Sequence, residues 1–173
     1  ASRATSMGMS LGSLDAGTHI ALSSGRDIEL TGTSRSGSYQ DWQADGQIDF
    51  ERLLAGGQAL LDSLLDTRGR FIQADQGIVA KAGWRNGVAS PAEMVFEQAV
   101  APRMELRSGQ LIRVNDASIG ESAELSAQQI ELYGRHSGDG LLRLRVQGLN
   151  NDGKPGDTFR TRLDAAPCSS RLP

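Results

Sequence analysis

Residues 16–32, AGTHIALSSGRDIELTG, contain one short unit twice, first at 16–22 and again at 24–30. The unit is small-Gly-x-x-Ile-x-Leu. Its two aliphatic side chains lie on one face of a strand, because side chains alternate across the pleat. The glycine three residues earlier permits the crowded backbone of a corner. A strand this short is not stable alone, so the unit predicts copies stacked into a continuous aliphatic column.

The same unit returns in the last third of the chain. Residues 108–114 repeat it with Gly109, Ile112 and Val114 at the matching positions, and residues 127–134 resemble the segment that ends at Gly32. Such internal repetition predicts an all-β solenoid. A β-sandwich or an antiparallel meander also contains short alternating strands and glycine turns, and the repeat alone leaves these folds open.

The composition of the chain is typical of short strands joined by tight turns. Its 173 residues include 21 glycines, 38% hydrophobic residues and only 5% aromatic residues. A disordered chain would contain fewer aliphatic residues and a stronger net charge than the −3 found here. The cations are spread along the chain, so we expect no nucleic-acid partner, and no segment is apolar enough to predict a membrane span.

Residues 14–32 resemble the repeats of filamentous haemagglutinin-type exoproteins, the large adhesins of bacterial two-partner secretion. The resemblance is clear near residues 14–32 and 104–134. It implies a right-handed parallel β-helix, export of the parent protein through an outer-membrane secretion partner, and roles in attachment, biofilm, virulence or toxin presentation. The secretion domain and asparagine-rich motifs of that family are not seen in this sequence, so recognition of the secretion partner is not assigned to it.

From the repeat and the resemblance we expect a structural or adhesive segment of a large bacterial exoprotein, an internal or C-terminal fragment. It would be secreted or displayed on the cell surface and would attach to a glycan or protein receptor on cells or other surfaces. The chain starts without Met and has no signal peptide, so we expect the export signal to lie outside it. No cofactor is expected.

The alternative function is that of a β-helix carbohydrate-active enzyme, such as a polysaccharide lyase or hydrolase, or of a phage tail-spike-like domain. Such enzymes gather carboxylates on one face, with an Arg or Lys nearby. The acidic residues between 41 and 75 show no spacing that stacks carboxylates on successive rungs. We therefore do not expect an enzyme.

The middle of the chain departs from the repeat. We assign β-helix repeats to residues 1–36, an irregular excursion to 37–103, and further rungs with a terminal hairpin to 104–173, all within one continuous domain. Apolar residues at three- and four-residue spacings predict a helix near 49–67. The competing interpretation is a pair of β-helix strands with the glycines at 56–57 in a corner.

The C-terminal part predicts a β-hairpin. Leu142, Leu144 and Val146 alternate with polar residues, the turn-forming sequence NDGKPG follows at 151–156, and residues 158–163 return the chain. Such a hairpin could cover the unpaired edge of the last rung, or it could belong to a separate small β domain.

Aromatic residues outside the aliphatic column are the best candidates for a ligand surface. Tyr39, Trp42 and Trp84 lie in Gly- and Ser-rich stretches, and Arg85 adds a polar group beside Trp84. We predict that these four residues bind a ligand, by stacking on sugar rings or by anchoring a partner protein. The alternative is that each ring fills the side of the core.

Other chemistry is sparse. Asn150, Asp152 and Asp157 are weak candidates for a calcium site, but the EF-hand pattern is absent and a solvated turn is favoured, so no metal site is predicted. The two histidines lie far apart and no Gly-x-Ser-x-Gly motif is present, so no catalytic residue is predicted. The single cysteine, Cys168, excludes an intrachain disulfide, and its role stays open.

Overall fold

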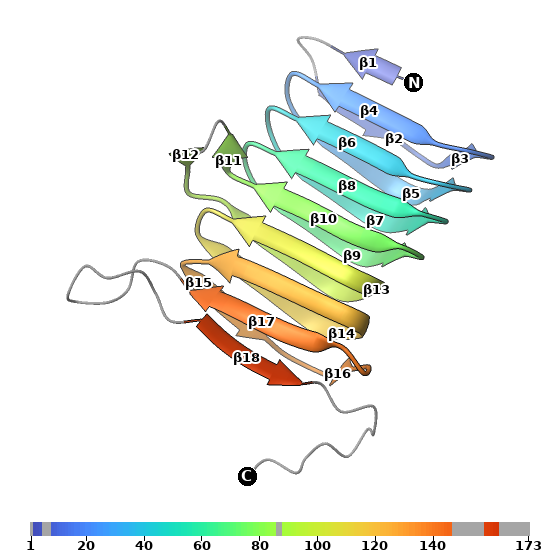
Figure 1. Ribbon diagram of the computed structural model, residues 1–173. Coiled ribbons are helices and arrows are strands. Elements are labelled where there is room, and N and C mark those ends of the chain that lie inside the picture. The colour runs from blue at the N-terminus through green and yellow to red at the C-terminus, as the bar shows by residue number, and fades with distance from the viewer. Residues whose placement is uncertain (1, 5–7, 86–87, 147–157, 163–173) are drawn as a thin grey trace.

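The computed structural model describes residues 2–4, 8–85, 88–146 and 158–162, and within these residues the chain is all-β with no helix. Figure 1 shows parallel strands stacked along one axis from the N-terminal β1 to β17, with the antiparallel β18 beside β17 at the C-terminal end. The stack is a right-handed parallel β-helix of about seven turns. The predicted fold class is therefore confirmed.

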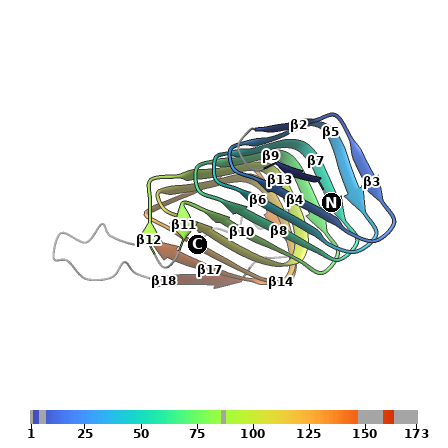
Figure 2. The same ribbon diagram turned by 90° about the horizontal axis from the view of Figure 1, so that it is seen from above.

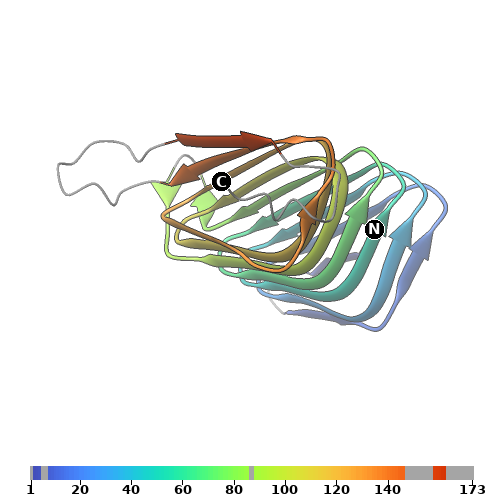
Figure 3. The same cartoon turned by 90° about the horizontal axis from the view of Figure 1, so that it is seen from below.

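Each turn, here called a rung, contains three strand segments, and the coil is seen end-on in Figures 2 and 3. Rungs 1 to 7 begin at residues that pair with one another in register: Met9, Ile28, Ile48, Thr67, Met94, Ile112 and Ile130. The true repeat is therefore one rung of 18 to 20 residues in most of the stack. The eight-residue shift seen in the sequence is the step between two sides of the same rung.

One side of the coil consists of separate short strands: β1 (Ser2–Ala4), β4 (Ile20–Ser24), β6 (Gln40–Ala44), β8 (Gln58–Ser63) and β10 (Gly77–Ala82). The other two sides are formed by β2 (Met9–Leu11), β3 (Leu14–Ala16), β5 (Ile28–Ser36), β7 (Ile48–Ala55) and β9 (Thr67–Ala74). From rung 5, β13 (Glu93–Ser108) and β14 (Leu111–Ala127) run around all three sides. Rung 7 divides again into β15 (Gln129–Leu132), β16 (His136–Ser137) and β17 (Leu141–Val146).

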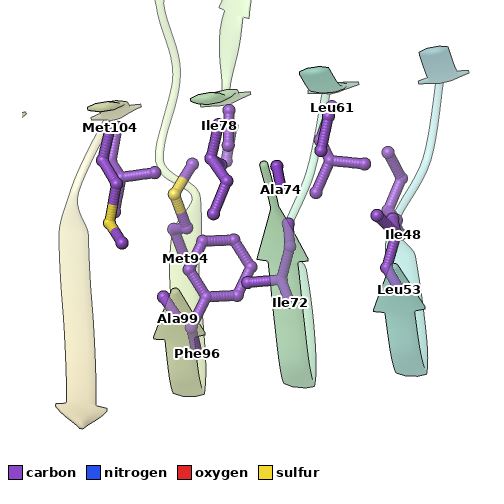
Figure 4. Close-up of a cluster of buried hydrophobic side chains, with 14 of the residues drawn as sticks. Ile48, Leu53, Leu61, Ile72, Ala74, Ile78, Met94, Phe96, Ala99 and Met104 are labelled. Carbon is purple, nitrogen blue, oxygen red and sulfur yellow. The ribbon is translucent and has the colours of Figure 1, made fainter. Parts of the chain in front are cut away.

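The core is a set of inward columns in which equivalent residues of successive rungs lie on one another. One column on the β4 side contains Leu22, Trp42, Leu61, Ala80, Leu106 and Leu125. All six are buried. Figure 4 shows how side chains from the different sides of the coil meet in the interior. Burial of these columns supplies the main stabilisation, because no single rung has a core of its own.

Residue volumes compensate one another along a column. Gly69 lies between Phe50 and Phe96 on the neighbouring rungs. A Cβ atom at Gly69 would overlap the Phe50 ring, so the missing side chain provides the space that this ring occupies. The rings of Phe50 and Phe96 consequently approach to 6.1 Å between centroids although they lie two rungs apart.

Rung 2 carries a polar network inside the core, centred on the fully buried Gln40. Its Oε1 accepts hydrogen bonds from Ser34 Oγ at 2.6 Å and from Trp42 Nε1 at 3.1 Å. Its Nε2 donates to the carbonyls of Ser34 at 3.2 Å and of Leu54, on rung 3, at 2.9 Å. The amide is thus fully satisfied, and the bond to Leu54 fixes the register between rungs 2 and 3.

The helix predicted near 49–67 is wrong. Strands β7 and β8 occupy this region, with the glycines at 56–57 in the corner between them, as the competing interpretation held. Only Leu53 and Leu61 of the leucine pairs at 53–54 and 60–61 are buried, because neighbouring residues of a strand face opposite sides. The apparent helical spacing arises from these pairs. Residues 37–103 continue the rungs, apart from a hairpin near residue 84.

The two strands of the predicted C-terminal hairpin are confirmed. Strand β18 (Thr158–Arg162) pairs antiparallel with β17, from Leu141 opposite Arg162 to Arg145 opposite Thr158. The predicted turn at 151–156 lies outside the described residues. In Figure 3, β18 runs along the outer edge of rung 7, as expected of a strand that covers an otherwise unpaired edge.

Candidate ligand-binding site

Rung 4 contains an insertion that the other rungs lack. Thr67 pairs with Met94, 27 positions further on, whereas Ile48 pairs with Thr67 after 19 positions and Met94 with Ile112 after 18. The additional residues include β11 (Trp84–Arg85) and β12 (Val88–Ala89), which pair antiparallel. Figure 1 shows these two strands projecting from the end of β10.

The insertion closes on itself at a narrow neck. The Ser90 N–H donates to the Gly83 carbonyl at 2.7 Å, and Ser90 Oγ donates to the same carbonyl at 3.2 Å. Gly83 has a φ of +73°, a left-handed conformation that favours glycine, and its own N–H donates to Ser63 on rung 3 at 2.9 Å. The Gln110 N–H of rung 5 donates to the Ala92 carbonyl just beyond the neck at 3.0 Å. The stack therefore continues past the hairpin without including it.

The base of the hairpin brings an aromatic ring and two cations together. The guanidinium carbon of Arg107 lies 5.3 Å from the centroid of the Trp84 ring, a cation–π contact. Arg107 on β13 is also the register partner of Lys81 on β10. Both cations and the indole are half-buried. The outer face beside the hairpin thus offers a flat apolar ring next to two neighbouring positive charges.

Arg85 holds the hairpin against the N-terminal rungs. Its guanidinium forms an ion pair with Asp45 and donates to the Ala44 carbonyl at 3.4 Å. Asp62, the register partner of Lys81, lies near this contact. Burial raises the pKa of the Asp62 carboxyl, and although Arg85 and Lys81 lower it, the pKa stays above its usual value.

The structure places two of the four predicted ligand-binding residues, Trp84 and Arg85, in this hairpin. Tyr39 lies elsewhere. It precedes β6, at the opposite end of that side of the coil from the hairpin, and it is 41% exposed. Its ring is stacked on that of His19, with centroids 5.0 Å apart and an interplanar angle of 8°. Tyr39 therefore belongs to a separate surface feature formed by rungs 1 and 2.

Trp42 is wrongly predicted as a surface residue, because its side chain is fully buried. Gln40, Trp42 and Ala44 point inward, while Asp41 and Gln43 between them face outward. The indole packs edge-on to Phe50 with centroids 5.9 Å apart. A ring in this position fills the core, the alternative held open for it, and it cannot stack on a ligand.

Lys81 and Arg107 were missed in the sequence. Each is the central residue of a short alternating segment, Ala80-Lys81-Ala82 and Leu106-Arg107-Ser108, which by itself indicates an outward side chain. Their contact depends on which rungs are adjacent. Aligning the chain by its full rung length, with the insertion removed, would have placed them side by side.

A separate groove of about 770 Å³ runs along the corner where β10 begins. Glu105 and Glu124 line it and are register partners on rungs 5 and 6. These two residues lie outside the segment 41–75, for which no stacking of carboxylates was expected. Within that segment, Asp49 lies in register with Glu29, a carboxylate that precedes the segment. Burial and the neighbouring carboxylates of Glu29, Asp27 and Asp66 raise the pKa of Asp49, and Arg68 opposes them.

Arginines lie close to the stacked carboxylates in the groove. Arg143 Nη1 is 3.4 Å from a Glu124 carboxylate oxygen, and Arg103 Nε is 2.6 Å from one of Glu121. His136 lies apart from the groove lining, with its Nε2 2.7 Å from the Tyr133 carbonyl. The groove therefore combines stacked carboxylates with arginines on an accessible surface.

Within the described residues, no group of three or more His, Cys, Asp or Glu side chains is arranged to hold a metal ion. Asn150, Asp152 and Asp157, the weak calcium candidates, lie outside those residues. The described part of the chain also contains no helix long and apolar enough to cross a bilayer.

Comparisons with protein families, with curated proteins and with solved structures give no match to this chain. The resemblance to haemagglutinin-type exoproteins therefore rests on the repeated units of residues 14–32 and 104–134 themselves.

Proposed function

We propose that this chain is a rigid β-solenoid segment of a larger secreted or surface-displayed bacterial exoprotein, and that it attaches to a receptor through the hairpin β11–β12. The receptor would be a glycan or a protein on cells or other surfaces. In this proposal the parent protein is exported through an outer-membrane partner, as the haemagglutinin-like repeat implies.

The observation that carries the proposal is the single insertion in rung 4. A solenoid needs nothing outside its coil to bury its core, since each rung packs on its neighbours. In repeat proteins, insertions into individual repeats map to loops that often form the binding face. Here the insertion is closed at Gly83 and Ser90 and carries Trp84 on the outer surface, as expected of an element retained for contact with another molecule.

The proposal is tested by removing the hairpin. Deletion of residues 84–91 joins Gly83 to Ala92 and restores a corner like the one at residues 64–66, so the solenoid should keep its circular dichroism spectrum and melting temperature. Adhesion of the purified chain to host cells and immobilised glycans should be lost. A matched control is Tyr39→Ala, which alters an exposed ring at the other end of that side of the coil. Undiminished adhesion by the deletion variant would overturn the proposed role of the hairpin.

The larger parent protein is tested separately by immunoblotting of cell-surface, periplasmic, cytosolic and medium fractions from the native host. A band far above 18.4 kDa on the surface or in the medium is expected. A cytosolic band of about the chain's own size would overturn the exoprotein proposal.

A second candidate function, a carbohydrate-active enzyme, is favoured by the stacked Glu105 and Glu124 beside Arg143 in the groove. Paired carboxylates of this kind carry out acid–base chemistry on polysaccharides. The test is release of reducing or unsaturated ends from acidic and neutral polysaccharides by the purified chain. Activity abolished by Glu105→Gln or Glu124→Gln would support it, and no release from any substrate would reject it.

A further inference from the structure

We propose that the base of the hairpin binds a sugar chain that carries single, well-separated carboxylates, with Arg107 and Lys81 facing the carboxylate and Trp84 facing the sugar ring. This inference rests on the proposed function, because it names the ligand of the same hairpin.

The first argument is the close approach of two like charges at this position. Lys81 and Arg107 are direct neighbours on parallel strands, which lie about 4.8 Å apart, and like charges in this arrangement repel one another. Within the described part of the chain, no carboxylate lies within the 4.0 Å limit of an ion pair from either cation. A bound carboxylate would offset this repulsion.

The second argument comes from a comparable pair on another side of the coil, on rungs 6 and 7. Arg113 also lies over an aromatic ring, with its guanidinium carbon 5.9 Å from the centroid of Tyr133. There, however, Arg113 Nε donates to a carboxylate oxygen of Glu131 at 2.7 Å. The two sites share a cation stacked on a ring, and they differ in that the Arg113 site contains its own carboxylate. The register position that Glu131 holds beside Arg113 is held beside Arg107 by Ser126, so the protein supplies no carboxylate there.

The third argument concerns the kind of anion. The planar guanidinium of Arg matches a carboxylate with two parallel hydrogen bonds, and a flat indole ring packs against the C–H face of a sugar. Asp62, next to Lys81 in register, and Asp45, which pairs with Arg85, place negative charge close to the two cations. These carboxylates would repel a continuous polyanion, but they can accept hydrogen bonds from sugar hydroxyls. A sugar with isolated carboxylates satisfies both conditions.

The test compares ligands on the purified chain. An oligosaccharide that carries one uronic acid among neutral sugars is titrated while tryptophan fluorescence is followed, with Trp84→Phe to separate the signal of the hairpin from that of the buried Trp42. We expect saturable binding that is weakened about 10- to 100-fold by Arg107→Gln, as loss of a charge-assisted hydrogen bond implies, and weakened in the same direction by Lys81→Gln. The matched control, Arg113→Gln, should bind like the wild type.

Three comparison ligands decide the chemistry. The carboxyl-reduced, neutral form of the same sugar should bind at least about tenfold more weakly, since each 1.4 kcal/mol is tenfold in affinity. A densely sulfated polysaccharide and a polyglutamate peptide should each bind more weakly than the oligosaccharide with one uronic acid at physiological salt. Equal binding of the neutral sugar, tighter binding of either polyanion, or unchanged binding by Arg107→Gln would overturn the inference. If the deletion of residues 84–91 still abolished adhesion in that case, the proposed function of the hairpin would stand with a different ligand.

Discussion

Rung 2 and rung 6 pack the same two inward positions of the coil by different means. In rung 2 these positions hold Gln40 and Trp42, which are joined by side-chain hydrogen bonds inside the core. In rung 6 they hold Ala123 and Leu125, which are buried and purely apolar. Rung 6 is instead linked to its neighbours from outside, by ion pairs of Glu121, Arg113 and Glu124 with residues of rungs 5 and 7.

Two kinds of contact therefore fix the register of a solenoid, and they differ in how much stability is lost when they are broken. A buried hydrogen bond is expensive to break, because the remaining donor or acceptor has no water to replace its partner. An exposed ion pair contributes little, because water and salt screen both charges. Changes inside rung 2 should therefore destabilise the chain far more than changes outside rung 6.

The largest effect is expected from Trp42→Ala. The substitution removes the indole from a fully buried site and takes a hydrogen-bond donor from Gln40, so it should lower the unfolding free energy by about 3–5 kcal/mol. Chemical denaturation followed by circular dichroism measures it. Leu65→Ala, at a leucine that is 45% exposed, is the control and should change stability by about 0.5 kcal/mol or less. Similar losses in the two variants would contradict the placement of Trp42 in the core.

Gln40→Leu should have the next largest effect. It keeps the volume but leaves Ser34 Oγ and Trp42 Nε1 without their acceptor, which costs about 1–3 kcal/mol in a buried site. The outward neighbour Gln43 provides the matched control, and Gln43→Leu should stay within about 0.5 kcal/mol of the wild type. Thermal unfolding of the three proteins in parallel measures the difference. A Gln40→Leu variant as stable as the wild type would show that the network contributes nothing.

Breaking the exposed ion pair between Arg113 on rung 6 and Glu131 on rung 7 should lower the unfolding free energy by less than Gln40→Leu does. The hydrogen bond from Arg113 lowers the pKa of Glu131, so the pair stabilises the fold above the usual Glu pKa of 4.5 and this contribution is lost as the pH falls through the lowered folded-state value. Arg113→Gln should therefore reduce stability at pH 7 and reduce the acid dependence of unfolding. High salt should diminish the difference from the wild type. A loss that persists unchanged in 1 M salt and at pH 3 would exclude the ion pair as its cause.

The smallest effect, a slight gain in stability, is expected from Asp62→Asn on the outer face of rung 3. Burial raises the folded-state pKa of Asp62, so its contribution to stability is present below the usual Asp pKa of 3.8 and is lost as the pH rises through the raised folded-state value. Asp62→Asn should thus slightly stabilise the chain at pH 7 and leave it unchanged at pH 3. Melting temperatures at the two pH values test this, and destabilisation at pH 7 would contradict it.

The fold was predictable because the units at 16–22, 24–30 and 108–114 repeat one inward pattern. The error at 49–67 has a physical cause. Leucine pairs across a glycine corner give the same spacings as a helical stripe, and the choice between them depends on packing against rungs 2 and 4, which local sequence does not contain.

The candidate site was predictable only in part. Trp84 stood out as a rare aromatic outside the repeat, and the structure places it at the surface. Trp42 lies in a Gly- and Ser-rich stretch like that of Trp84, yet it occupies the inward position that Leu22 holds one rung earlier. This match is visible only when the sequence is compared with itself at a step of 20 residues. The contact between Trp84 and Arg107 joins residues 23 positions apart and depends on the rung-to-rung register, so no local motif could have indicated it.

The neck at Gly83 and Ser90 also has a mechanical consequence. Tension applied between the two ends of the stack is carried from rung to rung by backbone hydrogen bonds such as those from Gly83 to Ser63 and from Gly109 to Ala82. The hairpin lies beside this path and is attached to rung 2 through Arg85 and Asp45. A protease that cut a peptide bond of the hairpin would therefore leave the two halves of the coil joined by the contacts between their rungs.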